Sequence, residues 1–168
     1  MSDSKCDACY DMESLMSEEI VKKLLIKSAK MTKSRGTSTC TILMLDKFTG
    51  KIYSVYVGDS RYLILRYDTN KKKFYKYFIS DEQTHHELFN TPYQIGDNGD
   101  DPGKAISHPH ELKNNDIVVL ATDGLWDNLE ISQIVEIVNM NYKSLLLLSP
   151  KELAIIIAEV AKKNSKNK

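Results

Sequence analysis

The chain has 168 residues, of which 42% are apolar, and this length is typical of one domain with a sizeable core. Lysine plus arginine and aspartate plus glutamate total 23 each, so the charge balance disfavours nucleic acid as a partner. No apolar run approaches the roughly 18 residues of a membrane span, and the acidic N-terminus lacks a signal-peptide core. We therefore expect a single soluble, intracellular domain over residues 1–168, with poor order in 1–16 and 164–168.

Cysteine usage indicates reduced thiols. Three cysteines do not make an even disulfide framework. Cys6 and Cys9 form one C-x-x-C pair, but a tetrahedral zinc site needs four ligands and no second pair follows. Cys40 lies in an apolar alternation, where a small buried thiol is the usual interpretation. The sequence thus disfavours both disulfides and zinc.

The first predicted elements are one helix and a group of strands. Ser17, followed by two glutamates, is typical of a helix N-terminus, and an apolar stripe continues to Met31. Short β-branched and aromatic runs come next, and they predict four antiparallel strands joined by tight turns. These runs are residues 38–45, 51–58, 62–67 and 73–79.

The second half of the chain changes character after residue 79. Residues 80–105 are polar and glycine-rich, which predicts a long functional or mobile connection without regular elements. A strand is expected at 116–122 and a helix at 131–140. Ser149 and Glu152, with proline between them, form a capping box that opens a last helix. Consecutive strands followed by helices indicate an α+β fold with antiparallel sheets covered by helices.

Two strand-like runs, VYVGDSRYLIL and DIVVLATDGLWDN, each carry an aspartate at the exposed end of an apolar segment. There Asp59 and Asp123 lie beside glycine, where a carboxylate can face a hard cation, so the pattern favours metal-assisted chemistry on phosphate. Taken singly, Asp59 is as typical of a turn, Asp123 of a strand-terminating turn, and Asp127 of a helix N-cap.

These runs resemble the metal-dependent type 2C protein serine/threonine phosphatases. VYVGDSRYLIL resembles the family's V-G-D-S-R hairpin, VVLATDGLWDN its A-[ST]-D-G-L-W-D signature, and RGTSTCTILML an earlier strand, all in the family's order. SDEQTHHELFNTPYQIG resembles the S-D-E-Q and F-N-T-P-x-Q segment of the divergent branch that includes mitochondrial type 2C phosphatases. The resemblance covers roughly Thr32 to Leu148 and implies an antiparallel β-sandwich flanked by helices.

The resemblance also implies a site. Two or more Mg²⁺ or Mn²⁺ ions would activate a water that hydrolyses phosphoserine or phosphothreonine in a phosphoprotein substrate. Asp123 matches the family's core metal aspartate, Asp59 the ligand of an additional, weaker ion, and Asp127 a residue that reaches that ion through water. Gly58 and Gly124 would support the site, Gly124 by letting the backbone approach closely. Trp126 is expected to be a packing anchor beside it.

The long polar connection contributes further candidates. Asp81 and Glu82 are expected either to line the rim of the site or to cap the loop. His85 and His86 are paired in a polar segment, where histidines are usually solvated, so we leave both out of the site.

Two ligand segments of complete members, an early D-G-x-G-G and a late [GD]-D-[ND], are not found, so we expect a partial domain that is shortened at both ends. The leading hypothesis is a segment of an active phosphatase, whose isolated activity is open. The second is a non-catalytic phosphatase-like binding or regulatory module, and the third an unrelated α+β interaction domain. The sequence indicates no oligomeric state, and it leaves both cytoplasm and mitochondria open, because the start carries no transit signal.

Overall fold

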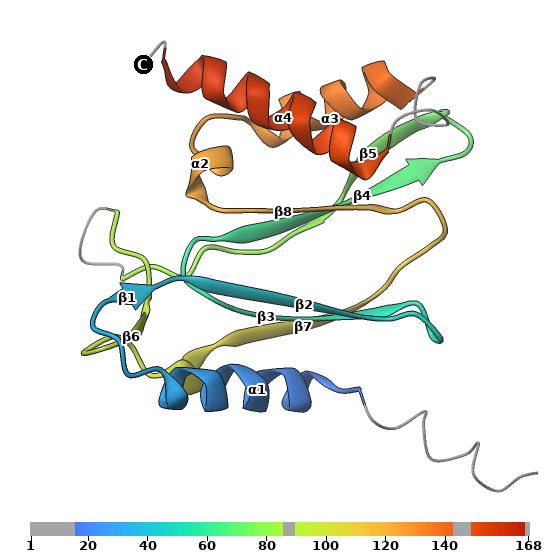
Figure 1. Ribbon diagram of the computed structural model, residues 1–168. Coiled ribbons are helices and arrows are strands. Elements are labelled where there is room, and N and C mark those ends of the chain that lie inside the picture. The colour runs from blue at the N-terminus through green and yellow to red at the C-terminus, as the bar shows by residue number, and fades with distance from the viewer. Residues whose placement is uncertain (1–15, 86–89, 143–148, 167–168) are drawn as a thin grey trace, which may run out of the picture. The chain divides into compact units, whose positions relative to one another are not determined.

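Helices and antiparallel strands make up the chain, as the sequence predicts (Figure 1). The computed structural model describes residues 16–85, 90–142 and 149–166. Within these ranges the chain forms two units, the first from residues up to Val57 together with Gln94–Leu112, and the second from Gly58–Tyr93 and everything after Leu112. The Cys6 and Cys9 pair and His86 lie outside the described residues.

The first unit is a three-stranded sheet with one helix on it (Figure 1). Helix α1 (Glu18–Met31) begins as predicted, because the hydroxyl of Ser17 accepts a hydrogen bond from the Ile20 amide at 3.4 Å. Val21 and Leu25 on its apolar stripe are fully buried. The sheet order is β2 (Cys40–Asp46), β3 (Lys51–Val57), β7 (Ile106–Glu111), and β1 (Thr37–Ser38) separately pairs with β6 (Ile95–Gly96).

The short elements β6 and η2 (Pro102–Lys104) correct the expectation of a connection without regular elements over residues 80–105. Strand β7 follows at positions where the sequence analysis expected no element. β7 reads ISHPHE, and its proline and two histidines hide the β-branched alternation that marks the other strands. Pro109 is tolerated because β7 is the edge of its sheet, where a missing backbone donor leaves no ladder partner unsatisfied.

The second unit has the sheet order β5 (Lys73–Ile79), β4 (Arg61–Asp68), β8 (Ile117–Ala121). β4 is the central strand, and its residues Tyr62 to Arg66 are all buried. The core lies between this sheet and the helices α3 (Ile131–Asn141) and α4 (Pro150–Ser165) (Figure 1). Its buried members include Leu63, Leu65, Phe74, Ile134, Val138 and Ile157.

Side-chain contacts fix the helices of this unit. Asn139 of α3 accepts from the Phe74 amide at 2.7 Å and donates to the Phe74 carbonyl at 3.0 Å, so it continues the ladder beyond β5. The predicted capping box of α4 is confirmed, with Ser149 and Glu152 bonding each other's backbone amides. The helix runs to Ser165, and Asn164 donates to the Asn128 carbonyl at 2.9 Å. No helix in the described ranges is long and apolar enough to cross a membrane.

The four consecutive strands were expected to be joined in sequence, but they belong to two sheets. β2 pairs with β3 and β4 with β5, whereas β3 and β4 are not neighbours. The break falls at Gly58, whose φ of +99° is a conformation that L side chains rarely adopt. This backbone turn ends the β3 ladder and leaves Asp59 between the two strands.

Candidate active site

The pairing of β4 with β8 brings the two predicted metal aspartates to one end of a sheet. The strands are antiparallel, and Arg61 lies opposite Ala121. Asp59 precedes Arg61 by two residues and Asp123 follows Ala121 by two, so both lie just beyond the same end of this strand pair. The charge of Asp123 acts on Asp59. The two aspartates, which are far apart in the sequence, therefore lie at the same end of one sheet because β4 pairs with β8.

Asp123 and Asp127 lie on one short helical turn. Helix α2 (Asp123–Trp126) follows β8 directly, and the Asp127 amide donates to the Asp123 carbonyl at 2.8 Å. Residues four apart lie on the same face of a helix, so both carboxylates face the same side. Both residues are exposed, and the Asp123 carboxylate accepts the Gly124 amide at 2.7 Å. These carboxylates are accessible to a ligand from solution.

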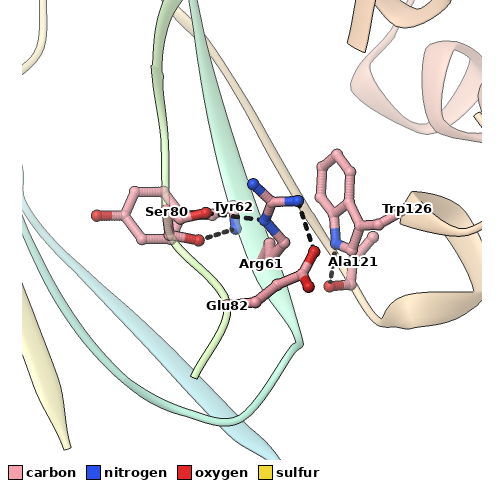
Figure 2. Close-up of polar contacts among 6 residues, drawn as sticks. All are labelled: Arg61, Tyr62, Ser80, Glu82, Ala121 and Trp126. Carbon is pink, nitrogen blue, oxygen red and sulfur yellow. Dashed lines mark hydrogen bonds and ion pairs between the residues drawn. The ribbon is translucent and has the colours of Figure 1, made fainter. Parts of the chain in front are cut away.

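Trp126 holds this turn against the sheet. Its indole Nε1 donates to the Ala121 carbonyl, the last residue of β8, at 2.9 Å (Figure 2). Its ring packs against the core of the second unit. The expectation of a packing anchor is confirmed, and the anchor limits where Asp123 can lie.

The Asp59 carboxyl is partly buried and lies among other acidic groups. Burial raises the pKa of the Asp59 carboxyl above its ordinary value, and the charges of Asp123, Glu82 and Asp127 raise the pKa further, while its own backbone amide lowers it. Four acidic side chains, those of Asp59, Glu82, Asp123 and Asp127, therefore contribute negative charge around Asp59. The raised pKa means that negative charge there is poorly compensated, and a bound cation would relieve it.

The donor chemistry suits a hard divalent cation that keeps part of its hydration shell. Carboxylate oxygens are the ligands Mg²⁺ and Mn²⁺ prefer, and Mg²⁺ is commonly held by one or two carboxylates together with waters. Among residues 16–85, 90–142 and 149–166, no three histidines, cysteines, aspartates or glutamates lie close enough to form a ligand group by themselves. Asp59 and Asp123 lie beyond the same end of the β4–β8 pair, and two carboxylates are a donor set that suits a largely hydrated ion.

The two site-supporting glycines differ in their backbone. Gly58 is buried at positive φ, and its carbonyl accepts the Gln83 amide at 2.9 Å. At Gly124 an added Cβ would meet only the Thr122 hydroxyl, at the ordinary contact distance of 3.6 Å. The backbone explains glycine at position 58, whereas the role of Gly124 in close approach stays a prediction.

Arg61 is the residue that the sequence analysis did not single out. Its guanidinium donates from Nε to the Ser80 carbonyl at 2.8 Å and pairs through Nη1 with the Glu82 carboxylate at 2.8 Å (Figure 2). The charge of Glu82 also acts on Asp59, as expected of a residue at the rim of the site. The only sequence feature that could have indicated a role for Arg61 is its position directly after Gly-Asp-Ser. Elsewhere in the segment, His85 is exposed and stacks on Tyr93 with ring centroids 4.2 Å apart.

We expect the Asp59→Asn variant to melt at a higher temperature than the wild type when divalent cations are chelated. The substitution removes a half-buried charge that its surroundings disfavour. Because the pKa of Asp59 is raised, the wild type loses stability as the pH rises through that pKa, so the advantage of the variant is present at neutral pH and shrinks on acidification. Thermal melts of the wild type and the variant, followed by circular dichroism at neutral and at acidic pH, test this. A lower melting temperature for the variant than for the wild type at neutral pH would contradict it.

Comparisons with known proteins find phosphatases among the relatives of this chain. The family model described as Protein phosphatase 2C matches residues 104–167, which include Asp123 and Asp127. The chain is 34% identical over 129 residues to "Protein phosphatase PTC7 homolog fig" of Drosophila ananassae, covering 68% of this chain and 36% of that protein. It is 35% identical over 136 residues to "Putative protein phosphatase 2C 24" of Oryza sativa subsp. japonica, covering 80% of this chain and 39% of that protein.

A solved structure, that of the photosystem II phosphatase PBCP, superposes with a TM-score of 0.71 at 28% identity, over 92% of this chain and 55% of that one. The matches cover well under half the length of the Drosophila ananassae and Oryza sativa relatives. The superposition supports the predicted type 2C-like α+β fold. Sequence motifs, the superposition and the matched relatives agree, and the chain belongs to the type 2C protein phosphatase family, where it is related to the PTC7 homologues.

Proposed function

We propose that this chain is part of a phosphatase that hydrolyses phosphoserine and phosphothreonine in proteins. The observation that carries the proposal is the approach of Asp59 and Asp123 at one end of the β4–β8 pair, with Asp127 and Glu82 adding negative charge. Family membership supplies the reaction class. The phosphoprotein substrate is inferred from the names of the relatives.

Residues of this chain would form a binding site for Mg²⁺ or Mn²⁺. When bound, such an ion supplies a water of lowered pKa and neutralises charge on the phosphate. Asp59 and Asp123 would be its protein ligands, held in place by the Gly58 turn and by the Trp126 anchor. Asp127 would accept a hydrogen bond from a water of the hydration shell. The cytoplasmic or mitochondrial location expected from the sequence stays a prediction.

A non-catalytic phosphatase-like module is the second candidate. The specific observation in its favour is that no group of three ligand side chains occurs among the described residues. Such a module would bind phosphoproteins, or weakly bind a cation, without turnover.

Release of inorganic phosphate from a phosphoserine peptide separates the two candidates. With the full chain and added Mn²⁺, the proposal predicts turnover that stops when the ion is chelated. Binding of the peptide without any phosphate release would instead support the second candidate.

A further inference from the structure

Arg61 fixes the segment that follows β5 onto the first residues of β4. Its guanidinium reaches this segment at two points, the Ser80 carbonyl and the Glu82 carboxylate, each at 2.8 Å (Figure 2). The Arg61 side chain is only 19% exposed, whereas that of Glu82 is 50% exposed. An exposed ion pair is usually worth little, but this arginine is largely buried and is oriented by its second bond.

Backbone hydrogen bonds hold the same segment on both sides of Glu82. On one side, the Tyr62 amide donates to the Ser80 hydroxyl and the Ser80 amide to the Tyr62 carbonyl, both at 3.0 Å. On the other side, the Gln83 amide donates to the Gly58 carbonyl at 2.9 Å. Glu82 is thus attached to the turn that carries Asp59, and the side chain of Arg61 selects the direction of its carboxylate.

The direction of that carboxylate bears on the candidate metal centre. The charge of Glu82 acts on Asp59 together with the charges of Asp123 and Asp127. Asp81, directly before Glu82, is exposed on the same segment and offers a natural comparison. An acidic group outside the ligand shell accepts hydrogen bonds from metal-bound waters and orients them.

We propose that Arg61 is a positioning residue that holds the Glu82 carboxylate toward Asp59, where Glu82 serves as an outer acidic group and strengthens the binding of a hydrated divalent cation. This inference rests on the proposed function, because it presumes that Asp59 binds the ion. It adds two residues to that site and assigns neither a direct bond to the metal.

The sign of the effect at Arg61 makes the inference testable. Removing a positive charge close to a cation site would by itself tighten cation binding, since like charges repel. If Arg61 acts by positioning Glu82, its loss instead weakens binding. Arg61→Met therefore distinguishes a positioning role from a purely electrostatic one by the direction of the change.

The experiment is a Mn²⁺ titration of the full chain, without phosphopeptide, that follows the electron paramagnetic resonance signal of free Mn²⁺. We expect Glu82→Gln to weaken binding about tenfold, in the range typical of lost outer-shell partners. Arg61→Met is expected to weaken binding by a similar factor, and Arg61→Lys to recover part of the loss because lysine can still reach the carboxylate. Asp81→Asn, which removes the same charge one residue away, is the matched control and is expected to change binding much less.

Three results would overturn the inference while the wild type still binds Mn²⁺. These are equal losses in Asp81→Asn and Glu82→Gln, tighter binding in Arg61→Met, and a fall in phosphopeptide kcat/KM for Arg61→Met with unchanged Mn²⁺ affinity, which would place Arg61 on the substrate phosphate. Circular dichroism melts confirm that each variant is folded, and Glu82→Gln serves alone if Arg61→Met is not. A wild type that binds no Mn²⁺ would remove the proposed metal site itself, and this inference with it.

Discussion

Replacement of Asp116 by alanine is expected to lower the free energy of unfolding of the second unit by about 3–5 kcal/mol, the usual consequence of removing one partner of a buried ion pair. The Asp116 side chain is 1% exposed and that of Arg66 is 10% exposed. The arginine donates to both carboxylate oxygens, from Nη2 at 2.8 Å and from Nε at 3.1 Å. The variant leaves the Arg66 charge buried without its carboxylate.

Other contacts of the pair add to this expectation. The Asp116 carboxylate also accepts the Lys113 amide at 2.8 Å, and the Arg66 guanidinium lies 3.7 Å from the centre of the Tyr77 ring. The hydrogen bond to Asp116 raises the pKa of Arg66. The arginine also stays charged without this partner, because a guanidinium is not deprotonated in proteins. The pair joins β4 to the segment that leads into β8, and it therefore also supports the register on which the site depends.

Urea denaturation followed by Trp126 fluorescence measures the effect, because Trp126 is the single tryptophan and lies in the second unit. Asp116→Asn is expected to lose less stability than Asp116→Ala, since the amide oxygen still accepts hydrogen bonds. Glu159→Ala, at an exposed position of α4, is the control and is expected to leave the midpoint unchanged. If Asp116→Ala and the wild type unfold at the same urea concentration, the ion pair between Arg66 and Asp116 does not contribute to the stability of the second unit.

Features that depend on neighbouring residues could be predicted from the sequence. The Ser17 cap, the capping box at Ser149 and the apolar runs of β2 to β5 are all local signals, and each marks an element that the structure contains. β7 could not be predicted in this way, because its ladder partner β3 is distant in sequence and supplies what the local pattern lacks.

In the candidate site, too, the sequence predicted local features but not contacts between distant residues. Asp59 and Asp123 were identified because each is an acid just beyond an apolar run, but only the Arg61–Ala121 register brings them together. The contact between Arg61 and Glu82 joins residues 21 apart through a side chain, and no spacing rule predicts it. Sequence patterns thus identified the two aspartates, and the pairing of β4 with β8 determined that they lie at the same end of one sheet.

The Asp123→Ala variant is expected to lower Mn²⁺-dependent phosphate release by about a hundredfold or more, since even outer-shell partners of a metal typically contribute tenfold to a hundredfold. The variant is expected to fold, because the Asp123 side chain is exposed and accepts a hydrogen bond from the adjacent Gly124 amide. Initial rates with a phosphoserine peptide, with and without a chelator, measure the effect.

Asp127→Ala provides the graded comparison for this prediction. Asp127 lies on the same helical turn and is also exposed, but it is proposed to act through water, so a smaller loss is expected. Equal rates for the wild type and Asp123→Ala would rule out metal-dependent catalysis at this site. A larger loss for Asp127→Ala than for Asp123→Ala would reverse the proposed roles.

The most direct test of the metal centre is the anomalous diffraction of crystals of the full chain soaked in Mn²⁺. We predict a peak at the end of the β4–β8 pair, with carboxylate oxygens of Asp59 and Asp123 about 2 Å from the ion and waters in its remaining positions. An ion bound elsewhere on the chain, or no anomalous peak near either aspartate at saturating Mn²⁺, would contradict the account.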